Sequence, residues 1–184
     1  PDELKDAITP KTAMLVLNSP SNPGGFTYTP DELRALAKVL EGTDICVISD
    51  EIYEKLIYGD TQFVSFASLS EDAFKRTLTL NGFSKTFSMT GWRLGYGVMP
   101  ADLAEQVAKL QTNCNSCTAS FSQVAGIDAE LCPRQHGHIR RANAQTGAHR
   151  PVQVREVDTA ELVGGVPALV IPASQRIEGW ELQE

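Results

Sequence analysis

One lysine and one arginine lie in a run of small, hydroxyl and aromatic residues. In "GFSKTFSMTGWRLG", residues 82–95, Lys85 is followed eight positions later by Arg93. An amine so isolated from other charges is either an ordinary surface group or a reactive amine that can act as a nucleophile. An arginine here could form an ion pair at a strand end, or its planar donors could bind a phosphate. The segment lacks the Gly-x-x-x-x-Gly-Lys pattern of a phosphate loop.

Further polar residues follow apolar runs earlier in the chain. Asn22 lies in "SPSNPGG", residues 19–25, whose residue types are those of a turn. The run "VISDEIY", residues 47–53, leads from a buried-looking strand into Asp50 and Tyr53. An acid at the carboxyl end of a strand in an open α/β sheet lies where ligands bind, although an Asp also commonly caps the next turn. One helical turn after the strand would let Asp50 and Tyr53 face the same way.

Strand-like and helix-like patterns alternate through the first 130 residues. The segment 29–42 is the clearest helix, because Thr29, Pro30 and Glu32 form a capping box with proline at the first helical position, and Gly42 is placed to end it. A second helix is expected over residues 100–113, and short strands over 13–18, 45–49, 77–80 and 94–98. This rhythm predicts an α/β fold with a mostly parallel sheet. The segment between Lys85 and Arg93 must curl back, and Thr90 with Gly91 is expected to allow this.

The character of the chain changes near Leu131. All phenylalanines, tyrosines, methionines and lysines precede that residue, and all three histidines follow it. We therefore divide the chain into residues 1–130 and an atypical tail, residues 131–184. The tail is interpreted either as a flexible or disordered linker followed by a strand in "GGVPALVIPA", or as the product of a shifted reading frame.

Composition limits the classes of partner. The 184 residues carry a net charge of −7 and a pI near 5.0, which argues against nucleic acid and anionic membranes. No stretch approaches the roughly 20 apolar residues of a membrane span, so a soluble cytoplasmic protein is expected. The four cysteines are expected to be reduced thiols. One metal-binding alternative remains, a zinc module with a C-x2-C and a C-x3-H pair formed by Cys114, Cys117, Cys132 and His136; no other metal ligands are expected.

Three segments taken together resemble a known family. "NSPSNPGG", "VISDEIYEKLIY" and "SKTFSMTGWRLGY", in this order and spacing, are similar to the fold type I, class I/II pyridoxal phosphate-dependent aminotransferases, in particular the aspartate aminotransferase branch. The resemblance covers residues 1–130 and implies a central fragment of the large domain, a three-layer α/β sandwich. It also implies a homodimer in the full-length family.

The resemblance assigns a role to each polar residue. Lys85 corresponds to the lysine that holds the cofactor aldehyde as an internal aldimine and later moves a proton. Asp50 matches the carboxylate beside the pyridine nitrogen, Asn22 and Tyr53 match the donors to the phenolic oxygen, and Arg93 matches the phosphate ligand. Three residues before the lysine, where many relatives carry a phosphate-binding serine, this chain has Gly82, and Ser84 is taken as the substitute.

The function implied is a transaminase that moves an amino group between an amino acid and a 2-oxo acid. Two alternatives stay open: a catalytically incompetent fragment of such an enzyme, and a pyridoxal phosphate-dependent lyase on the same fold. The substrate-binding arginine of the family belongs to a C-terminal domain that the tail does not resemble.

Overall fold

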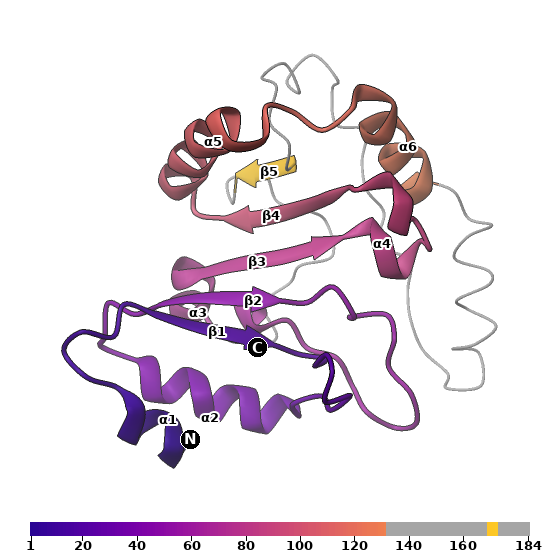
Figure 1. The fold of residues 1–184 in the computed structure, drawn as a ribbon. Coiled ribbons are helices and arrows are strands. Elements are labelled where there is room, and N and C mark those ends of the chain that lie inside the picture. The colour runs from indigo at the N-terminus through magenta and orange to yellow at the C-terminus, as the bar shows by residue number, and fades with distance from the viewer. Residues whose placement is uncertain (132–168, 173–184) are drawn as a thin grey trace.

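The computed structural model describes residues 1–131 and 169–172 (Figure 1). The elements in chain order are α1 (Asp2–Ala7), β1 (Met14–Asn18), α2 (Pro30–Leu40), β2 (Cys46–Asp50), η1 (Phe66–Ser68), α3 (Glu71–Arg76), β3 (Thr77–Gly82), α4 (Phe83–Thr86), η2 (Thr90–Trp92), β4 (Gly95–Met99), α5 (Ala101–Asn115), α6 (Ser120–Leu131) and β5 (Leu169–Pro172). The four expected strands and both expected helices are present, with ends that differ by a residue or two. The other expectations for the tail fall on residues 132–168 and 173–184, which lie outside the described ranges.

The five strands form one mixed sheet in the order β1-β2-β3-β4-β5. Strands β1, β2 and β3 are parallel, β4 is antiparallel to β3, and β5 is parallel to β4. The α/β class and the mostly parallel sheet are confirmed, with one antiparallel pair as the exception. The exception has a simple cause, because the short connection 83–94 reverses the chain at the end of β3 rather than crossing over the sheet, as a parallel partner would require.

Helix α2 begins at the predicted capping box. The Thr29 hydroxyl accepts from the Glu32 amide at 3.3 Å, and the Glu32 carboxylate accepts from the Thr29 amide at 2.7 Å. The helix ends at Leu40, and Gly42 follows with a left-handed φ of 74°. Local sequence therefore sets both ends of this helix.

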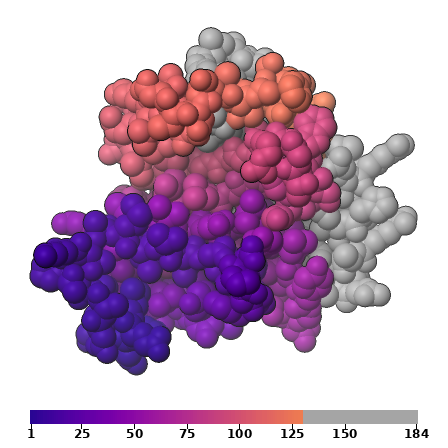
Figure 2. Space-filling model, in the orientation of Figure 1, coloured from indigo at the N-terminus to yellow at the C-terminus, as the bar shows by residue number. Residues whose placement is uncertain are grey.

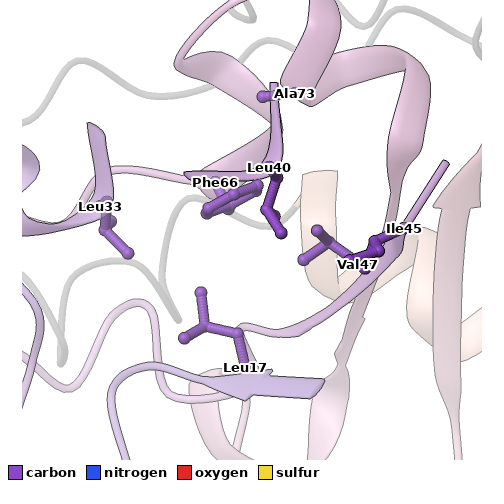
Figure 3. Packing of buried hydrophobic residues seen from close by; sticks show 7 residues of the cluster. All are labelled: Leu17, Leu33, Leu40, Ile45, Val47, Phe66 and Ala73. Atoms are coloured by element: carbon purple, nitrogen blue, oxygen red, sulfur yellow. The ribbon is translucent and has the colours of Figure 1, made fainter. Parts of the chain in front are cut away.

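One face of strands β1 and β2 is covered by α2, η1 and α3. The buried residues of this core are Leu17, Leu33, Leu40, Ile45, Val47, Phe66 and Ala73 (Figure 3). Side chains alternate along a strand, so the next residues point to the opposite face. There, Val16 is 68% exposed and Met14 is 50% exposed.

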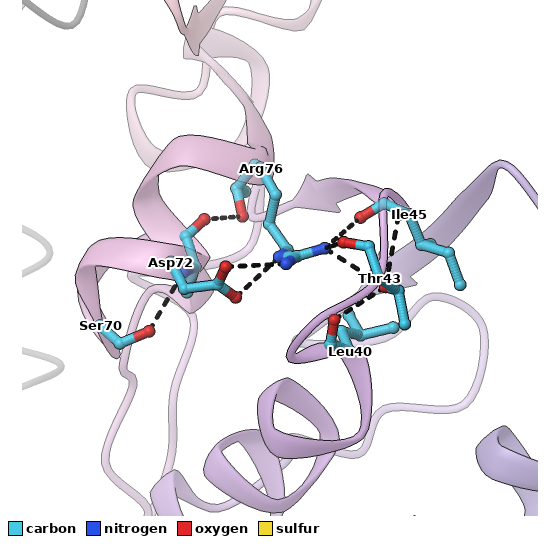
Figure 4. A network of polar contacts seen from close by, with 8 residues as sticks. Leu40, Thr43, Ile45, Ser70, Asp72 and Arg76 are labelled. Atoms are coloured by element: carbon cyan, nitrogen blue, oxygen red, sulfur yellow. Dashed lines mark hydrogen bonds and ion pairs between the residues drawn. The ribbon is translucent and has the colours of Figure 1, made fainter.

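Arg76 fastens α3 to the loop between α2 and β2 (Figure 4). Its guanidinium makes a two-bond ion pair with Asp72 and donates to the backbone carbonyls of Thr43 and Ile45 at 2.9 and 2.8 Å. Since Ile45 directly precedes β2, these bonds help to fix where that strand begins.

A second core lies around α4, β4 and α6. Phe83, Met89, Leu94 and Ala129 are its buried residues. In the space-filling view, α5 and α6 lie at the top of the molecule, and the N-terminal residues lie at the bottom (Figure 2). Within the described part of the chain, no helix is both long and apolar enough to cross a membrane.

Candidate active site

The carboxyl ends of β1 and β2 meet at one edge of the sheet. Asn18 and Asp50 are paired in the register of these strands, and the Asn18 side-chain amide donates to the Asp50 backbone carbonyl at 3.3 Å. The Asn18 side-chain oxygen in turn accepts from the Asn22 backbone amide at 2.8 Å. Asn18 thus connects two of the predicted site residues, Asn22 and Asp50. The sequence reasoning missed it, although it is the polar residue that closes an apolar strand just before the turn cluster.

Tyr53 lies beside Asn22 and Lys85. A turn follows β2, in which the Glu54 amide donates to the Glu51 carbonyl and the Leu56 amide donates to the Tyr53 carbonyl. The Tyr53 hydroxyl accepts from the Asn22 side-chain amide at 3.1 Å. The Lys85 Nζ lies 5.4 Å from the centroid of the Tyr53 ring. The structure therefore brings four predicted residues, Asn22, Asp50, Tyr53 and Lys85, into one connected group.

The position of Lys85 at this edge is set by strand β3 and by the packing of helix α4. It lies in α4, directly after β3, whose carboxyl end is at the same edge because β3 is parallel to β2. Phe83 anchors α4: its amide donates to the Leu94 carbonyl at 3.2 Å, and its ring stacks on Phe87 at 5.2 Å between centroids. A Cβ built on Gly126 of α6 would lie 2.5 Å from Leu94, so the helix packs closely there.

Arg93 and Ser84, the other two predicted site residues, do not join this connected group in the described residues. Arg93 is exposed, donates to the Thr90 carbonyl at 3.0 Å and lines an open pocket with Ser88 and Trp92. In the described residues no contact joins it to Lys85. Ser84 is partly buried, and its hydroxyl makes no hydrogen bond within residues 1–131.

The chain reverses between Lys85 and Arg93 by a route that the sequence did not predict. Ser88 has φ 57° and Arg93 has φ 54°, both in the left-handed region, whereas Gly91 is not left-handed. Thr90 and Gly91 lie in η2, a single 3-10 turn within the reversal, as expected, but the left-handed residues that redirect the chain are Ser88 and Arg93. The closely packed ends of this segment, Phe83 and Leu94, set the backbone path and override the usual preference for glycine.

Glu51 lies behind the site, on the covered face of the sheet, and is 2% exposed. Its Oε1 accepts from the Ser49 hydroxyl at 2.8 Å, the Ser65 hydroxyl at 2.9 Å and the Phe66 amide at 3.1 Å. Burial raises the pKa of Glu51 to about 7, although these three hydrogen bonds act in the opposite direction. The sequence reasoning gave this residue no role, and only its position between Asp50 and Tyr53 pointed to it.

Three charged side chains of the candidate set have no ion-pair partner among the described residues. The Asp50 carboxylate accepts only from the Ile52 amide at 3.2 Å, and the ion pairs of residues 1–131 include neither Lys85 nor Arg93. Since partly buried charges are usually paired, the Lys85 amine and the Asp50 carboxylate are available to a ligand that carries complementary groups, and the exposed Arg93 guanidinium is available to an anion.

The zinc alternative gains no support from the described residues. Cys114 and Cys117 are exposed free thiols, and no group of three potential metal ligands occurs in the part of the chain that the structure describes. Cys132 and His136 lie outside that part, so the four-residue module is not tested.

Comparison with known proteins identifies the family. The family model described as aminotransferase class I and II matches residues 1–146. The chain belongs to this family. Among curated relatives of this aminotransferase chain, the aspartate aminotransferase of Geobacillus stearothermophilus is 44% identical over 135 residues, and that of Bacillus subtilis is 46% identical over 135 residues. Each alignment covers 73% of the chain and 34% of the relative.

Solved structures agree with this assignment. The aromatic aminotransferase of Pyrococcus horikoshii superposes with a TM-score of 0.73 at 43% identity, over 76% of this chain and 37% of that one. The aspartate aminotransferase of Thermus thermophilus gives a TM-score of 0.70 at 33% identity. The chain therefore spans about a third of the length of the relatives that it matches, as expected for a fragment.

Proposed function

We propose that this chain carries the cofactor-binding centre of a pyridoxal phosphate-dependent transaminase, which moves an amino group between an amino acid and a 2-oxo acid. The observation that carries the proposal is the connected group at the sheet edge. An amine without an ion-pair partner in the described residues, that of Lys85, lies over Tyr53, whose hydroxyl accepts from Asn22. Asn18 links Asn22 to Asp50. Membership of the aminotransferase family supports the same conclusion.

The residue types suit each part of pyridoxal phosphate. When bound, the cofactor supplies an aldehyde that condenses with amines and a ring that withdraws electrons from the substrate. Lys85 would hold the aldehyde carbon, and Asp50 would hold a proton on the ring nitrogen. Asn22 and Tyr53 would bind the phenolic oxygen. Arg93 would bind the phosphate through its forked donors, with Ser84 as a further ligand.

Each side chain has a task in proton transfer or orientation. The Lys85 amine, once displaced by the substrate amine, would take the proton from the substrate α-carbon and return it at the neighbouring position. The Asp50 carboxylate would favour a protonated ring nitrogen through its negative charge. The hydrogen bond between Asn22 and Tyr53 fixes the direction of the phenol, so that both can face one ring oxygen.

The relatives' names give the substrate class of those proteins, which are aspartate and aromatic aminotransferases. For this chain we extend the proposal to an amino acid and a 2-oxo acid without choosing the side chain. A homodimer and a cytoplasmic location belong to the same proposal: the first rests on the resemblance, and the second on composition.

The test is cofactor binding by the purified chain. Lysine-bound pyridoxal phosphate absorbs in the visible, so the wild-type chain should give a visible band that borohydride reduction fixes to a peptide containing Lys85. The Lys85→Ala variant should lose the band. Lys55→Ala is the matched control, because Lys55 lies two residues after Tyr53 and pairs only with Glu54 in the described residues. A band of wild-type strength in Lys85→Ala would contradict the proposal.

A second measurement separates transamination from lyase chemistry. With a panel that includes aspartate and aromatic amino acids, a transaminase converts the amino acid to its 2-oxo acid and leaves the amino group on the cofactor. A lyase would instead release ammonia, carbon dioxide or a side-chain fragment. Formation of aminated cofactor in step with 2-oxo acid is the expected result.

A further inference from the structure

The turn that carries Tyr53 begins a long connection. Residues 52–64 link the end of β2 to η1 and contain no helix or strand. Residues 58–62 within it are exposed. A segment of this kind costs conformational entropy to order and needs an anchor to place one side chain accurately.

Glu51 provides such an anchor from the covered side of the sheet. Its backbone amide donates to the Leu80 carbonyl of β3 at 2.9 Å, which fixes the start of the connection. Its side chain accepts from Ser65 and from the Phe66 amide, which fixes the other end. The core residue Phe66 is fully buried, so the far end is itself rigidly placed. The carboxylate also accepts from the Ser49 hydroxyl of β2 at 2.8 Å, so the side chain itself joins the end of β2 to the start of η1.

This link acts on two residues of the proposed site. Asp50 directly precedes Glu51, and Ile52 directly follows it. The Ile52 backbone amide donates to the Asp50 carboxylate at 3.2 Å and so orients it. Tyr53 comes next, and its ring contacts Lys85. A shift of the Glu51 backbone would move the Ile52 amide and the Tyr53 ring together. Glu51 does not face the proposed ring, because it lies on the opposite face of the sheet from Asp50.

We propose that Glu51 is a positioning residue of this site: it ties β2 to η1 and so orients Asp50 and Tyr53 toward the cofactor ring. This inference rests on the proposed function. Glu51 touches neither cofactor nor substrate and acts through its two neighbours.

The first test needs no cofactor. Glu51→Ala leaves two serines and an amide in the core without an acceptor and can unfold the chain, so Ser65→Ala, which removes one donor, is the second variant. In Ser65→Ala, amide hydrogen exchange of a peptide covering residues 50–56 should be about tenfold faster than in the wild type. Ser68→Ala is the matched control, because the Ser68 hydroxyl donates to the Ser65 carbonyl within η1 and not to Glu51. Unchanged exchange in Ser65→Ala would overturn the proposal.

The second test compares pyridoxal phosphate with an analogue in which carbon replaces the ring nitrogen. The wild type should bind the cofactor more tightly, because Asp50 pairs only with the nitrogen. Ser65→Ala should lose about tenfold in affinity for pyridoxal phosphate and less than about threefold for the analogue. Glu51→Gln keeps an acceptor oxygen and should retain affinity within about threefold of wild type, whereas Glu54→Gln, on the same turn, should behave as wild type.

The outcomes separate the two proposals. Equal losses for both ligands in Ser65→Ala would show that the effect does not act through Asp50, which overturns the positioning role as proposed while the proposed function stands. Absence of cofactor binding by the folded wild type would overturn the proposed function and the positioning role with it. Faster exchange together with the selective loss of affinity supports both.

Discussion

At the scale of single residues, the site combines groups that differ in burial. Asn22 is exposed, Asp50, Tyr53 and Lys85 are partly buried, and Glu51 is buried behind them. The exposed and partly buried groups can reach a ligand. The buried glutamate cannot, and its cost in solvation is only partly offset by three hydrogen bonds. Because Glu51 is buried, its ionisation should affect the stability of the fold.

The burial of Glu51 predicts a pH dependence of stability. The pKa of Glu51 is raised from 4.5 to about 7 in the folded chain. At a pH between these two values, the folded state therefore holds a proton that the unfolded state has lost. The contribution of Glu51 to the free energy of unfolding should therefore be greatest below about pH 4.5, fall by roughly 3 kcal/mol as the pH rises to about 7, and stay constant above that. The nearby Glu54 carboxylate acts in the same direction, as it also disfavours the charged form.

Urea unfolding at about pH 5 and about pH 8 measures this dependence. Glu51→Gln should remove the difference between the two values, since an amide does not titrate. If the wild type and Glu51→Gln change equally with pH, the carboxylate is not the group responsible.

At the scale of elements, α3 is joined to the start of β2 by Arg76. Its side chain is 11% exposed, and it satisfies two backbone carbonyls as well as Asp72. Exposed ion pairs contribute little, but a cation that satisfies buried carbonyls leaves them unpaired when it is removed. The same helix offers an exposed pair for comparison, Lys75 with Glu71.

Arg76→Ala should lower the free energy of unfolding by about 2 kcal/mol, because the Thr43 and Ile45 carbonyls lose their donor. Lys75→Ala should change it by less than about 0.5 kcal/mol, since both partners are in water. Denaturant midpoints of the two variants give the comparison. Equal effects would show that Arg76 acts only as a surface ion pair.

Elements were predicted from sequence where local rules decide them. The capping box of Thr29 and Glu32 sets the start of α2, and apolar runs between turn residues mark four strands. The antiparallel direction of β4 could not be predicted from propensity, because it follows from the length and path of the 83–94 connection. The left-handed Ser88 and Arg93 were missed for the same reason, since tertiary packing of Phe83 and Leu94 determines them.

The site was predicted unevenly for a related reason. The grouping of Asn22, Asp50, Tyr53 and Lys85 follows from parallel strands that end at one edge, which the α/β rhythm already implied. Asn18 and Glu51 were not found, because their roles depend on hydrogen-bond partners in other strands and loops. Such partners are distant in sequence and leave no local pattern.

At the scale of the whole molecule, the face of β1 opposite the core carries exposed apolar side chains. Val16 is 68% exposed and Met14 is 50% exposed. Exposed apolar patches bind apolar dyes and promote association.

The Val16→Lys variant should bind less of a fluorescent apolar dye than the wild type and show less concentration-dependent association. Because Val16 is on the exposed face, the variant should keep its free energy of unfolding in urea within about 0.5 kcal/mol of the wild-type value. Leu17→Lys, one residue along, is the contrasting variant: Leu17 is 6% exposed and in the core, so that substitution should unfold the chain. Dye binding unchanged in Val16→Lys would show that this face is not the one that the dye detects.

The order of strands in the sheet has a consequence for how the molecule forms. Strands β1, β2 and β3 each pair with the next strand along the chain, over shorter intervals than the one from Met99 to Leu169 that separates β4 from β5. Loop closure is slower and more costly over longer separations. Strands β1 to β4 can therefore pair with one another before β5 joins the sheet. We expect the edge that holds Asp50 and Lys85 to form before the β4–β5 pairing.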